Sequence, residues 1–468
     1  MSEIEDAVDA ADELAPLTDA IAAALPAGWK LETLGSLCEK SQYGWTTKAD
    51  KDGQGVKFLR TTDITPGVVD WERVPFCVEA PPDLEKYLIR EGDLLISRTG
   101  SIGVNYLVSN PEPAVFASYL IRFRPKKSTS TKYLRYYLQS PTYWRAIAAG
   151  KKGIAVQNVN ATMLSKIPVP VAPDSEQLEI VAEIEKQFSR LDEAVANLQR
   201  VKANLKRYKA SVLKDAVEGR LVPTEAEIAR REGRSYETGE QLLQRILEAR
   251  RNEWRGKGKY KEPTSPVTAN LPQLPEGWTW ATMPQLGELN RGKSKHRPRD
   301  DAALYGGPYP FIQTGDVRRS DGSITAHSQT YSEFGLKQSR LWPIGTLCIT
   351  IAANIAETGI LKLEACFPDS VVGFVSDQGY PTTEYVEFFI RTARAGLDRF
   401  ASATAQKNIN LEVLEAVAVP TPPLAEQRRI VAEVDRRLSL IRGVESEVNA
   451  NLNRAQALRQ ATLAKAFS

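Results

Sequence analysis

The sequence predicts an α+β protein in which two similar globular domains are separated by two long helices that pair as an antiparallel coiled coil. Landmarks in the first half of the 468-residue chain return about 250 residues later. This period indicates a duplicated domain, because the repeats of solenoids run about 20–50 residues. Each copy holds short β-type runs broken by Gly, Pro and Asp. After each copy, apolar residues recur at steps of three and four, as in a coiled coil.

Four sets of residues match in order along the two copies. They are Pro26, Gly28 and Trp29 with Pro275, Gly277 and Trp278; residues 58–64 with 311–317; residues 158–160 with 408–410; and Glu176 and Gln177 with Glu426 and Gln427. A duplicated fold presents two similar surfaces, so we expect the chain to recognise two similar things.

These landmarks divide the chain into six segments. We expect an acidic N-terminal extension (1–25), a first globular domain (26–173), a central helix (174–219), a charged linker with a short helix at about 239–254 (220–274), a second globular domain (275–423) and a C-terminal helix (424–468). Each globular copy also has a helical pattern late in its sequence, at about 131–149 and 383–401.

The central helix has start and stop signals. Asp174 can cap it, with Gln177 three residues on, and Gly219 suits the position just past its end. A helix from 176 to 218 would be roughly 65 Å long at about 1.5 Å per residue.

Both long helices carry one narrow apolar stripe, which we call the seam. Its residues are Val181, Ile184, Phe188, Leu191, Val195, Leu198, Leu205, Tyr208 and Val212 in the first helix, and Val431, Val434, Leu438, Ile441, Val448, Leu452, Ala455, Leu458 and Thr462 in the second. Two such helices most simply bury their seams against each other. The alternative is that each helix packs separately on its own domain.

Composition narrows the class of protein. With 42% hydrophobic and 25% charged residues the chain has an ordinary globular composition, and no apolar run approaches the ~20 residues of a membrane span. Residues 1–29 contain seven acids and no Lys or Arg, so a signal peptide is not expected and we predict a cytoplasmic protein. Four cysteines without CxxC spacing and only two histidines argue against a metal site or disulfide framework.

The net charge of +3 conceals a basic lean. Without the acidic residues 1–29, basic residues exceed acidic ones by ten, which favours a polyanionic partner modestly.

One motif would indicate nucleotide binding: residues 287–294 match the phosphate-binding pattern GxxxxGKS. That motif needs a helix directly after it, and Pro298 falls where the helix should run. Nucleotide binding is therefore not expected.

Candidate DNA contacts lie at matching places in the two copies. Arg, Lys, Gln and Asn side chains bind phosphates and purine edges, and aromatic and hydroxyl groups add contacts. In the first copy we predict contacts from Gln42, Tyr43, Trp45, Thr46, Lys48, Arg60, Arg98, Thr99, Lys151, Lys152 and Gln157. In the second copy we predict them from Arg291, Lys293, Lys295, Arg297, Gln313, Arg318, Asn354, Gln406 and Lys407.

The two copies differ in chemistry at these places. Residues 291–299 hold five cations on an expected exposed loop, whereas residues 42–48 of the first copy hold amide, aromatic and hydroxyl groups. Two equivalent loops of different chemistry are what two recognition specificities would need, and ordinary solvated loops are the alternative. Asp63 and Asp316 recur identically, so we assign them turn or capping roles. No arrangement for nucleophilic or acid–base catalysis is found, so the chain is expected to perform no chemistry.

The ordered landmarks resemble the specificity (S) subunit of type I restriction–modification systems. The resemblance is carried by the openings Pro26/Trp29 and Pro275/Trp278, the strands at 92–96 and 345–349, the exits at 167–170 and 417–420 that lead into Glu-Gln helices, and residues 211–223. It covers 26–468. It implies that the globular copies are target recognition domains, each reading one half of a split duplex DNA target.

The same resemblance implies the partners. Two modification (methyltransferase) subunits would bring S-adenosylmethionine, and restriction (motor-nuclease) subunits would bring ATP and Mg²⁺, so this chain would bind no cofactor, no metal and no membrane. Three alternatives stay open: a free-standing bipartite DNA-binding protein, the S-like subunit of a related bipartite restriction system, and a coiled-coil scaffold that binds protein.

Overall fold

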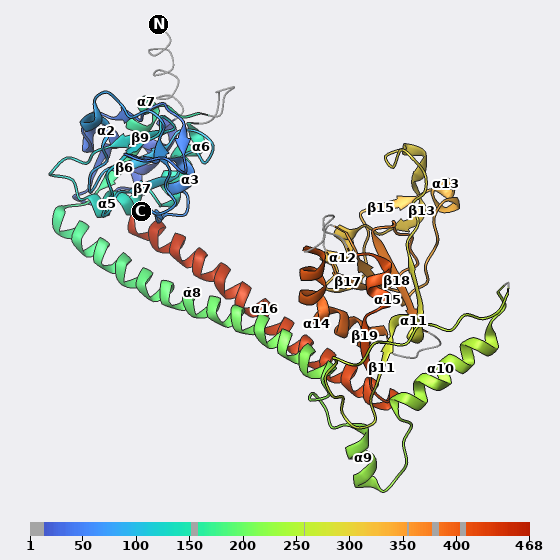
Figure 1. Cartoon of the computed structure of the whole chain (residues 1–468). Helices are drawn as coiled ribbons and strands as arrows, with labels where there is room; N and C mark the ends of the chain where they lie inside the picture. The colour runs from blue at the N-terminus through green and yellow to red at the C-terminus, as the bar shows by residue number, and fades with distance from the viewer. Residues whose placement is uncertain (1–13, 151–157, 257, 353–354, 377–382, 403–408) are drawn as a thin grey trace. The chain divides into compact units, whose positions relative to one another are not determined.

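The computed structural model describes residues 14–150, 158–256, 258–352, 355–376, 383–402 and 409–468. The chain divides into two compact units, Met1–Gln199 with Asn449–Ser468, and Arg200–Val448. Each unit holds one globular domain together with part of each long helix, α8 (Asp174–Val217) and α16 (Leu424–Ala466) (Figure 1). The mixed sheets, the duplication and the two long helices confirm the predicted fold class.

The described residues of the first unit form three small sheets. β1 (Lys30–Thr33) pairs antiparallel with β10 (Pro168–Val171). One four-stranded sheet has the order β2 (Gln42–Tyr43), β9 (Leu120–Phe123), β6 (Leu94–Ser97), β7 (Asn105–Leu107). The other has the order β3 (Ala49–Asp50), β5 (Phe76–Cys77), β4 (Lys57–Leu59), β8 (Ala114–Phe116).

Short helices connect and cover these strands. They are α2 (Leu34–Leu37), α3 (Thr61–Ile64), α4 (Leu84–Tyr87), α5 (Thr131–Tyr137), α6 (Pro141–Ala149) and α7 (Ala161–Ser165). Residues 14–24 are also helical, and Leu14 is buried in the main core of this unit. The helical pattern predicted at 131–149 forms two helices, α5 and α6, instead of one. The break lies at Ser140, which caps α6, and Pro141, which begins it.

The second unit repeats this plan with longer strands. β11 (Thr279–Thr282) pairs antiparallel with β19 (Ala418–Thr421). A five-stranded sheet has the order β12 (Gly287–Arg291), β18 (Val371–Ser376), β16 (Leu347–Thr350), β17 (Thr358–Leu361), β14 (Gly322–Ile324), and β13 (Tyr305–Phe311) pairs with β15 (Gln329–Tyr331). The helices are α11 (Met283–Leu286), α12 (Thr314–Arg319), α13 (Glu333–Lys337), α14 (Thr383–Ser402) and α15 (Leu411–Glu415), with a 3₁₀ turn at Ala302–Leu304.

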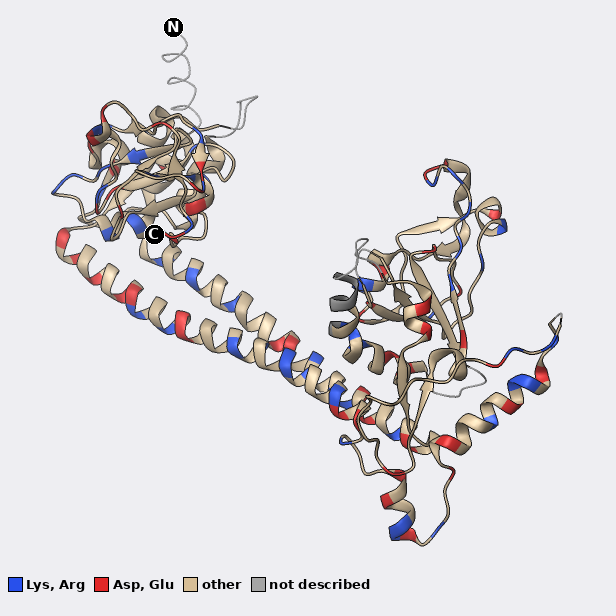
Figure 2. Cartoon of the chain, viewed as in Figure 1, with Lys and Arg blue, Asp and Glu red and all other residues tan. Residues whose placement is uncertain are grey.

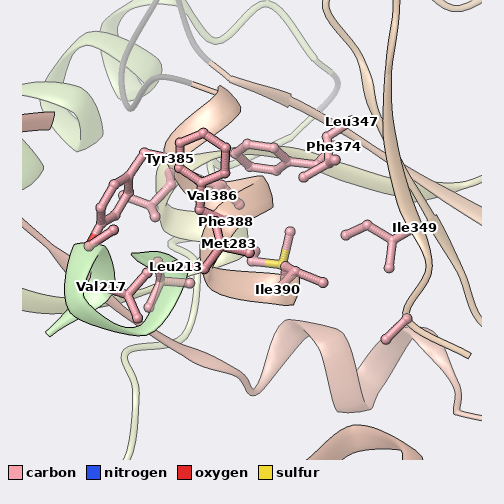
Figure 3. Close-up of a cluster of buried hydrophobic side chains, with 14 of the residues drawn as sticks. Leu213, Val217, Met283, Leu347, Ile349, Phe374, Tyr385, Val386, Phe388 and Ile390 are labelled. Atoms are coloured by element: carbon pink, nitrogen blue, oxygen red, sulfur yellow. The ribbon is translucent and has the colours of Figure 1, made fainter. Parts of the chain in front are cut away.

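The end of α8 belongs to the core of the second domain. Leu213 and Val217 lie among side chains of β16, β18 and α14 in one buried cluster (Figure 3). α8 ends at Val217, and Gly219 adopts a φ of +72°, as a residue just past a helix end does. Asp174 is the first residue of α8 instead of its cap, and the Gln177 amide donates to the Ala172 carbonyl, so the predicted capping box is not formed.

The two long helices run antiparallel to each other within each unit. In the first unit Asp192 forms an ion pair with Arg459, and Gln187 accepts a hydrogen bond from Thr462, so lower numbers in α8 meet higher numbers in α16. In the second unit Tyr208 lies beside Arg437. Tyr208 and Leu458, which the spacing placed on the seam, are 48% and 56% exposed, so that part of the prediction is wrong.

The other predicted seam residues lie at different depths. Val181, Ile184 and Phe188 are buried in the first core, and Val434, Leu438 and Ile441 in the second. Val448 is buried; Leu191, Val195, Leu198, Leu205, Val431 and Leu452 are half-buried. Burial deepens toward each globular domain, because there the helix gains a domain surface as well as its partner helix.

The linker contains two helices, one more than the sequence indicated. α10 (Gly239–Glu253) fits the expected helix, and α9 (Glu225–Glu232) precedes it with a reciprocal cap between Thr224 and Glu227. Glu225 is buried and forms ion pairs of 2.6 Å with Arg234 and with Arg429 of α16. The beginning of the linker is thus fixed to the start of the C-terminal helix.

Candidate nucleic-acid interface

The repeated landmarks form the same joint in each copy. The indole N–H of Trp29 donates to the Glu176 carboxylate at 3.1 Å, and that of Trp278 donates to Glu426 at 3.0 Å. In both cases the Trp opens the globular domain and the Glu lies in the first turn of the long helix. The hydrogen bond attaches the start of each long helix to its globular domain, beside the pair formed by the first and last strands (β1 with β10, β11 with β19).

The second joint is the more deeply buried. Glu426 is fully buried and also accepts a hydrogen bond of 2.8 Å from the backbone N–H of Glu225. Burial raises the pKa of Glu426 to about 7. The neighbouring glutamines repeat as well: Gln177 donates to the Ala172 carbonyl and Gln427 to the Pro422 carbonyl, both at 2.8 Å. The shared residues of the two copies are therefore structural.

In the first copy, Tyr43 and Arg98 form a surface pair. The Arg98 guanidinium lies 5.0 Å from the centre of the Tyr43 ring, which is 40% exposed. The Tyr43 hydroxyl accepts a hydrogen bond from the Ala161 N–H at 2.9 Å, and the Thr99 carbonyl accepts one from Ser97. An arginine held over an aromatic ring keeps donors at its edge available to a ligand.

Trp45 extends this surface. Its indole N–H donates to the Glu79 carbonyl at 2.9 Å, and its backbone pairs with residues 116–118. Tyr119 follows in the same segment, is 59% exposed, and its carbonyl accepts a hydrogen bond from the backbone N–H of Arg98. The sequence alone does not single out Tyr119, because it directly precedes the apolar residues that form β9. Gly44 allows the close approach, since a Cβ there would lie 2.2 Å from the Ala117 carbonyl oxygen.

Two predicted residues of the first copy serve the fold. The Gln42 amide donates to the Lys86 carbonyl at 2.9 Å and accepts from the Arg122 guanidinium. Arg60 forms two hydrogen bonds, of 2.8 and 3.0 Å, with the Asp63 carboxylate, which also accepts from the Arg60 backbone N–H. Thr46 and Lys48 are exposed on the adjoining loop. Asp63 thus caps α3, as expected.

In the second copy, two of the five cations of residues 291–299, Arg291 and Arg299, are hydrogen-bonded to Asp369. Arg291 is the last residue of β12, paired with Val372, so it does not lie on a loop as predicted. It donates to the Asp369 carbonyl at 2.9 and 2.7 Å, and Arg299 donates to the Asp369 carboxylate at 3.0 and 3.1 Å. Asp369 is the organising residue that sequence reasoning missed, because it lies about 70 residues away.

The remaining cations face outward. Arg297 donates to the carbonyls of Ser294 and His296, both at 2.8 Å. Lys293 and Lys295 are exposed, and among the residues that the structure describes their ammonium groups have no hydrogen-bond or ion-pair partner. Their charged groups are thus left unpaired in the described part of the chain, unlike those of Arg291 and Arg299.

The start of α12 carries the counterpart of Arg60. Gln313 donates its side-chain amide N–H to the Gln329 side chain. Asp316 accepts from the Gln313 backbone N–H at 2.9 Å and from Arg319 at 2.7 Å, which confirms its capping role. Arg318 is exposed on the same helix.

Six predicted contacts cannot be placed. Lys151, Lys152, Gln157, Asn354, Gln406 and Lys407 lie outside the described residues. Residues 287–291 form a strand and residues 292–296 have no regular structure, so the phosphate-loop motif lacks the helix that it requires. Over the described ranges, no cluster of three or more His, Cys, Asp or Glu could hold a metal, and no helix is long and apolar enough to cross a membrane.

Comparison with known proteins decides the family. The model of the type I restriction modification DNA specificity domain matches residues 26–207 and again 275–452. The chain belongs to this family. It is 23% identical to the EcoBI specificity subunit of Escherichia coli over 88% of this chain and 79% of that protein. It is 21% identical to the EcoKI specificity subunit of E. coli K12 over 95% of this chain and 89% of that protein.

A solved structure shows the same fold. A chain from work on the "complex assembly and conformational transition of the type I R-M system" aligns with a TM-score of 0.63 at 19% identity, over 95% of this chain and 98% of that one. The specificity-domain model covers both globular domains and most of both long helices, and it leaves residues 208–274 between its two matches.

Proposed function

We propose that this specificity-family chain reads a bipartite duplex DNA target, with one half-site for each globular domain, as the specificity subunit of a type I restriction–modification complex. One observation carries the proposal. The two copies share the joint made by Trp29 and Trp278 with their glutamates, yet they present different side chains at equivalent surface positions. A duplicated scaffold with different exposed chemistry suits two different half-sites.

Each surface offers a distinct set of groups to DNA. The first presents Tyr43, Trp45 and Tyr119 around Arg98, whose planar fork suits a guanine edge or a phosphate. The second presents the exposed ammonium groups of Lys293 and Lys295, together with the side-chain amide of Gln313, which donates to Gln329. Lysines contact the backbone as point charges, and a glutamine amide suits an adenine edge.

The long helices would set the spacing between the half-sites. α8 has 44 residues and so spans roughly 66 Å at about 1.5 Å per residue. Half-sites on one face of a duplex lie ~34 Å apart or a multiple of this. A helix of this length is sufficient to separate two domains by one or more turns of DNA.

The chain would act through partners and would not itself be catalytic. Its relatives are specificity subunits of type I restriction enzymes. We propose that two modification subunits supply S-adenosylmethionine, that restriction subunits supply ATP and Mg²⁺, and that this chain binds none of these. The exposed faces of α8 and α16 are available for such docking.

The test is to purify the tagged chain from its host and identify the proteins that accompany it. An adenine methyltransferase in about twofold excess supports the proposal, and methylome sequencing then names the two half-sites. A chain recovered alone and monodisperse would overturn the assembly part. Host DNA without a methylated split motif would overturn the recognition part.

A further inference from the structure

The linker contains a structured surface that neither copy of the duplicated domain accounts for. Residues 208–274 lie between the two family matches. The first half of α10 is fixed to the second domain: Leu242, Leu243 and Ile246 are buried. Gly239 lies against the Thr421 carbonyl, where a Cβ would come within 2.3 Å. Most residues between 248 and 262 are exposed, and this end of α10 extends away from the sheets of the second domain (Figure 1).

This exposed end has a defined conformation. Trp254 and Tyr260 meet edge to face with ring centres 5.7 Å apart, and the Trp254 indole N–H donates to the Gly258 carbonyl at 3.3 Å. A Cβ on Gly256 would lie 2.2 Å from the Trp254 ring, and Gly258 has a φ of +88°. The two glycines thus let the chain fold back beneath the tryptophan. We call residues 251–261, apart from Lys257, which lies outside the described residues, the basic knob.

The basic knob combines an exposed aromatic ring with a concentration of positive charge. Trp254 is 45% exposed and belongs to no hydrophobic core of the described chain. The basic knob contains four Lys or Arg (Arg251, Arg255, Lys259 and Lys261) and one acid, and blue segments lie at the far end of α10 in Figure 2. Lys259 and Lys261 are exposed.

Helix capping explains only part of this charge. Arg255 donates to the carbonyls of Asn252 and Trp254 at 3.0 and 3.3 Å, as cations at helix ends do. Arg251 forms an ion pair of 2.7 Å with Glu262. Neither role applies to Lys259 and Lys261, which lie beyond the helix, nor to the exposed ring of Trp254. The positive charge of Lys259 and Lys261 therefore favours a polyanionic ligand.

We propose that the basic knob is a second, sequence-independent DNA contact that grips the phosphate backbone beside the half-site read by the second domain. The inference rests on the proposed function. Lysines and an exposed aromatic ring suit backbone contact, because an ammonium group binds a phosphate as a point charge whatever the base sequence. The guanidinium of Arg250 donates to the Pro284 carbonyl, and Pro284 lies just before β12.

This anchor brings the basic knob within reach of the same duplex. β12 has five residues, which span roughly 17 Å, and its far end begins the loop of Lys293 and Lys295. Half a turn of duplex rises by a similar distance, about 17 Å. A duplex contacted by that loop can therefore present its next phosphates to the basic knob.

The test uses the full chain with Arg255→Gln, Lys259→Gln and Lys261→Gln combined. Affinity is measured between 50 and 200 mM salt for a duplex with the methylated motif and for one with both half-sites scrambled. Three lost phosphate contacts lower the slope of log K against log salt by about 2.7, so the variant loses about 40-fold less affinity over this range. The loss at low salt is equal on both duplexes, so their affinity ratio is unchanged.

The matched control is Arg230→Gln with Arg231→Gln, two cations at the end of α9, for which an unchanged slope is expected. An unchanged slope in the triple variant overturns the proposal, as does a changed affinity ratio. Loss of an accompanying protein with unchanged DNA binding assigns the surface to a protein instead. If the unmodified chain fails to prefer the motif, the recognition proposal fails, while the slope on scrambled DNA still tests the basic knob.

Discussion

The duplicated Trp–Glu joint permits an internally controlled prediction. Trp278→Phe removes the indole N–H that donates to the buried Glu426 carboxylate at 3.0 Å. A hydrogen bond to a charged group contributes about 1.5–3 kcal/mol, and Trp278 is itself 8% exposed. Trp29→Phe makes the same chemical change at the half-buried joint of the first copy, where we expect about 0.5–1.5 kcal/mol because water can replace the donor.

Hydrogen exchange in the full chain measures the two joints separately. At pH 8, above the Glu426 pKa of about 7, the carboxylate is mainly ionised and the donor matters most. Trp278→Phe should speed exchange in β11, β19 and the first turns of α16 by about tenfold to a hundredfold, since 1.4 kcal/mol corresponds to a factor of ten. Trp29→Phe should speed exchange around β1 and β10 by less than about tenfold.

The effect of Trp278→Phe on hydrogen exchange should also depend on pH. At pH 5.5 the Glu426 carboxyl is mainly protonated, so the effect of Trp278→Phe should shrink. Equal effects of the two substitutions, or an effect of Trp278→Phe that does not change between pH 5.5 and 8, would refute the idea that this buried bond holds the second domain to its helix.

Three further outcomes are expected. Lys293→Gln with Lys295→Gln should lower the salt slope of DNA binding by about 1.8, one step of about 0.9 per phosphate contact, and an unchanged slope would exclude both as phosphate contacts. Burial raises the pKa of Glu387 to about 7, so the folded state keeps this proton to a higher pH than the unfolded state does. The free energy of unfolding should therefore fall as the pH rises from about 4.5 to 7. Glu387→Gln should reduce this fall, measured by denaturation at pH 5 and 8, by an amount on the order of 2–3 kcal/mol. Gly44→Ala should weaken the contacts to the first half-site only, because the added Cβ would lie 2.2 Å from the Ala117 carbonyl oxygen. Its effect on affinity should therefore disappear on DNA whose first half-site is scrambled and persist on DNA whose second half-site is scrambled. An equal effect of Gly44→Ala on both DNAs would contradict this.

The sequence predicted the architecture because duplication and helical periodicity are properties of the whole chain. It also predicted which recurring aspartates cap helices: Asp63 and Asp316 were assigned structural roles, and both accept the backbone N–H at the start of a short helix. The partners of the repeated Trp and Glu could not be inferred, because they lie about 148 residues apart in each copy.

Individual site residues were harder to predict, because whether a side chain is free to bind a ligand depends on which neighbours pair with it, whether near in the sequence or far. Arg60 is held by Asp63, and Arg291 by the carbonyl of Asp369. Exposed Tyr119 resembled a strand residue in the sequence. Tyr208 matched the seam spacing but is exposed, because periodicity locates a face only approximately.

The most direct test of the account is an exchange of domains. Residues 30–166 would be replaced by the corresponding segment of another specificity subunit, which supplies its own first strand to pair with β10, and Trp29 and Glu176 would be retained. Methylome sequencing of a host expressing the chimera with its modification subunits would then report the target. The account predicts that one half-site changes while the other half-site and the spacing between them stay the same. A change in both half-sites, or in neither, would contradict the assignment of one half-site to each globular domain.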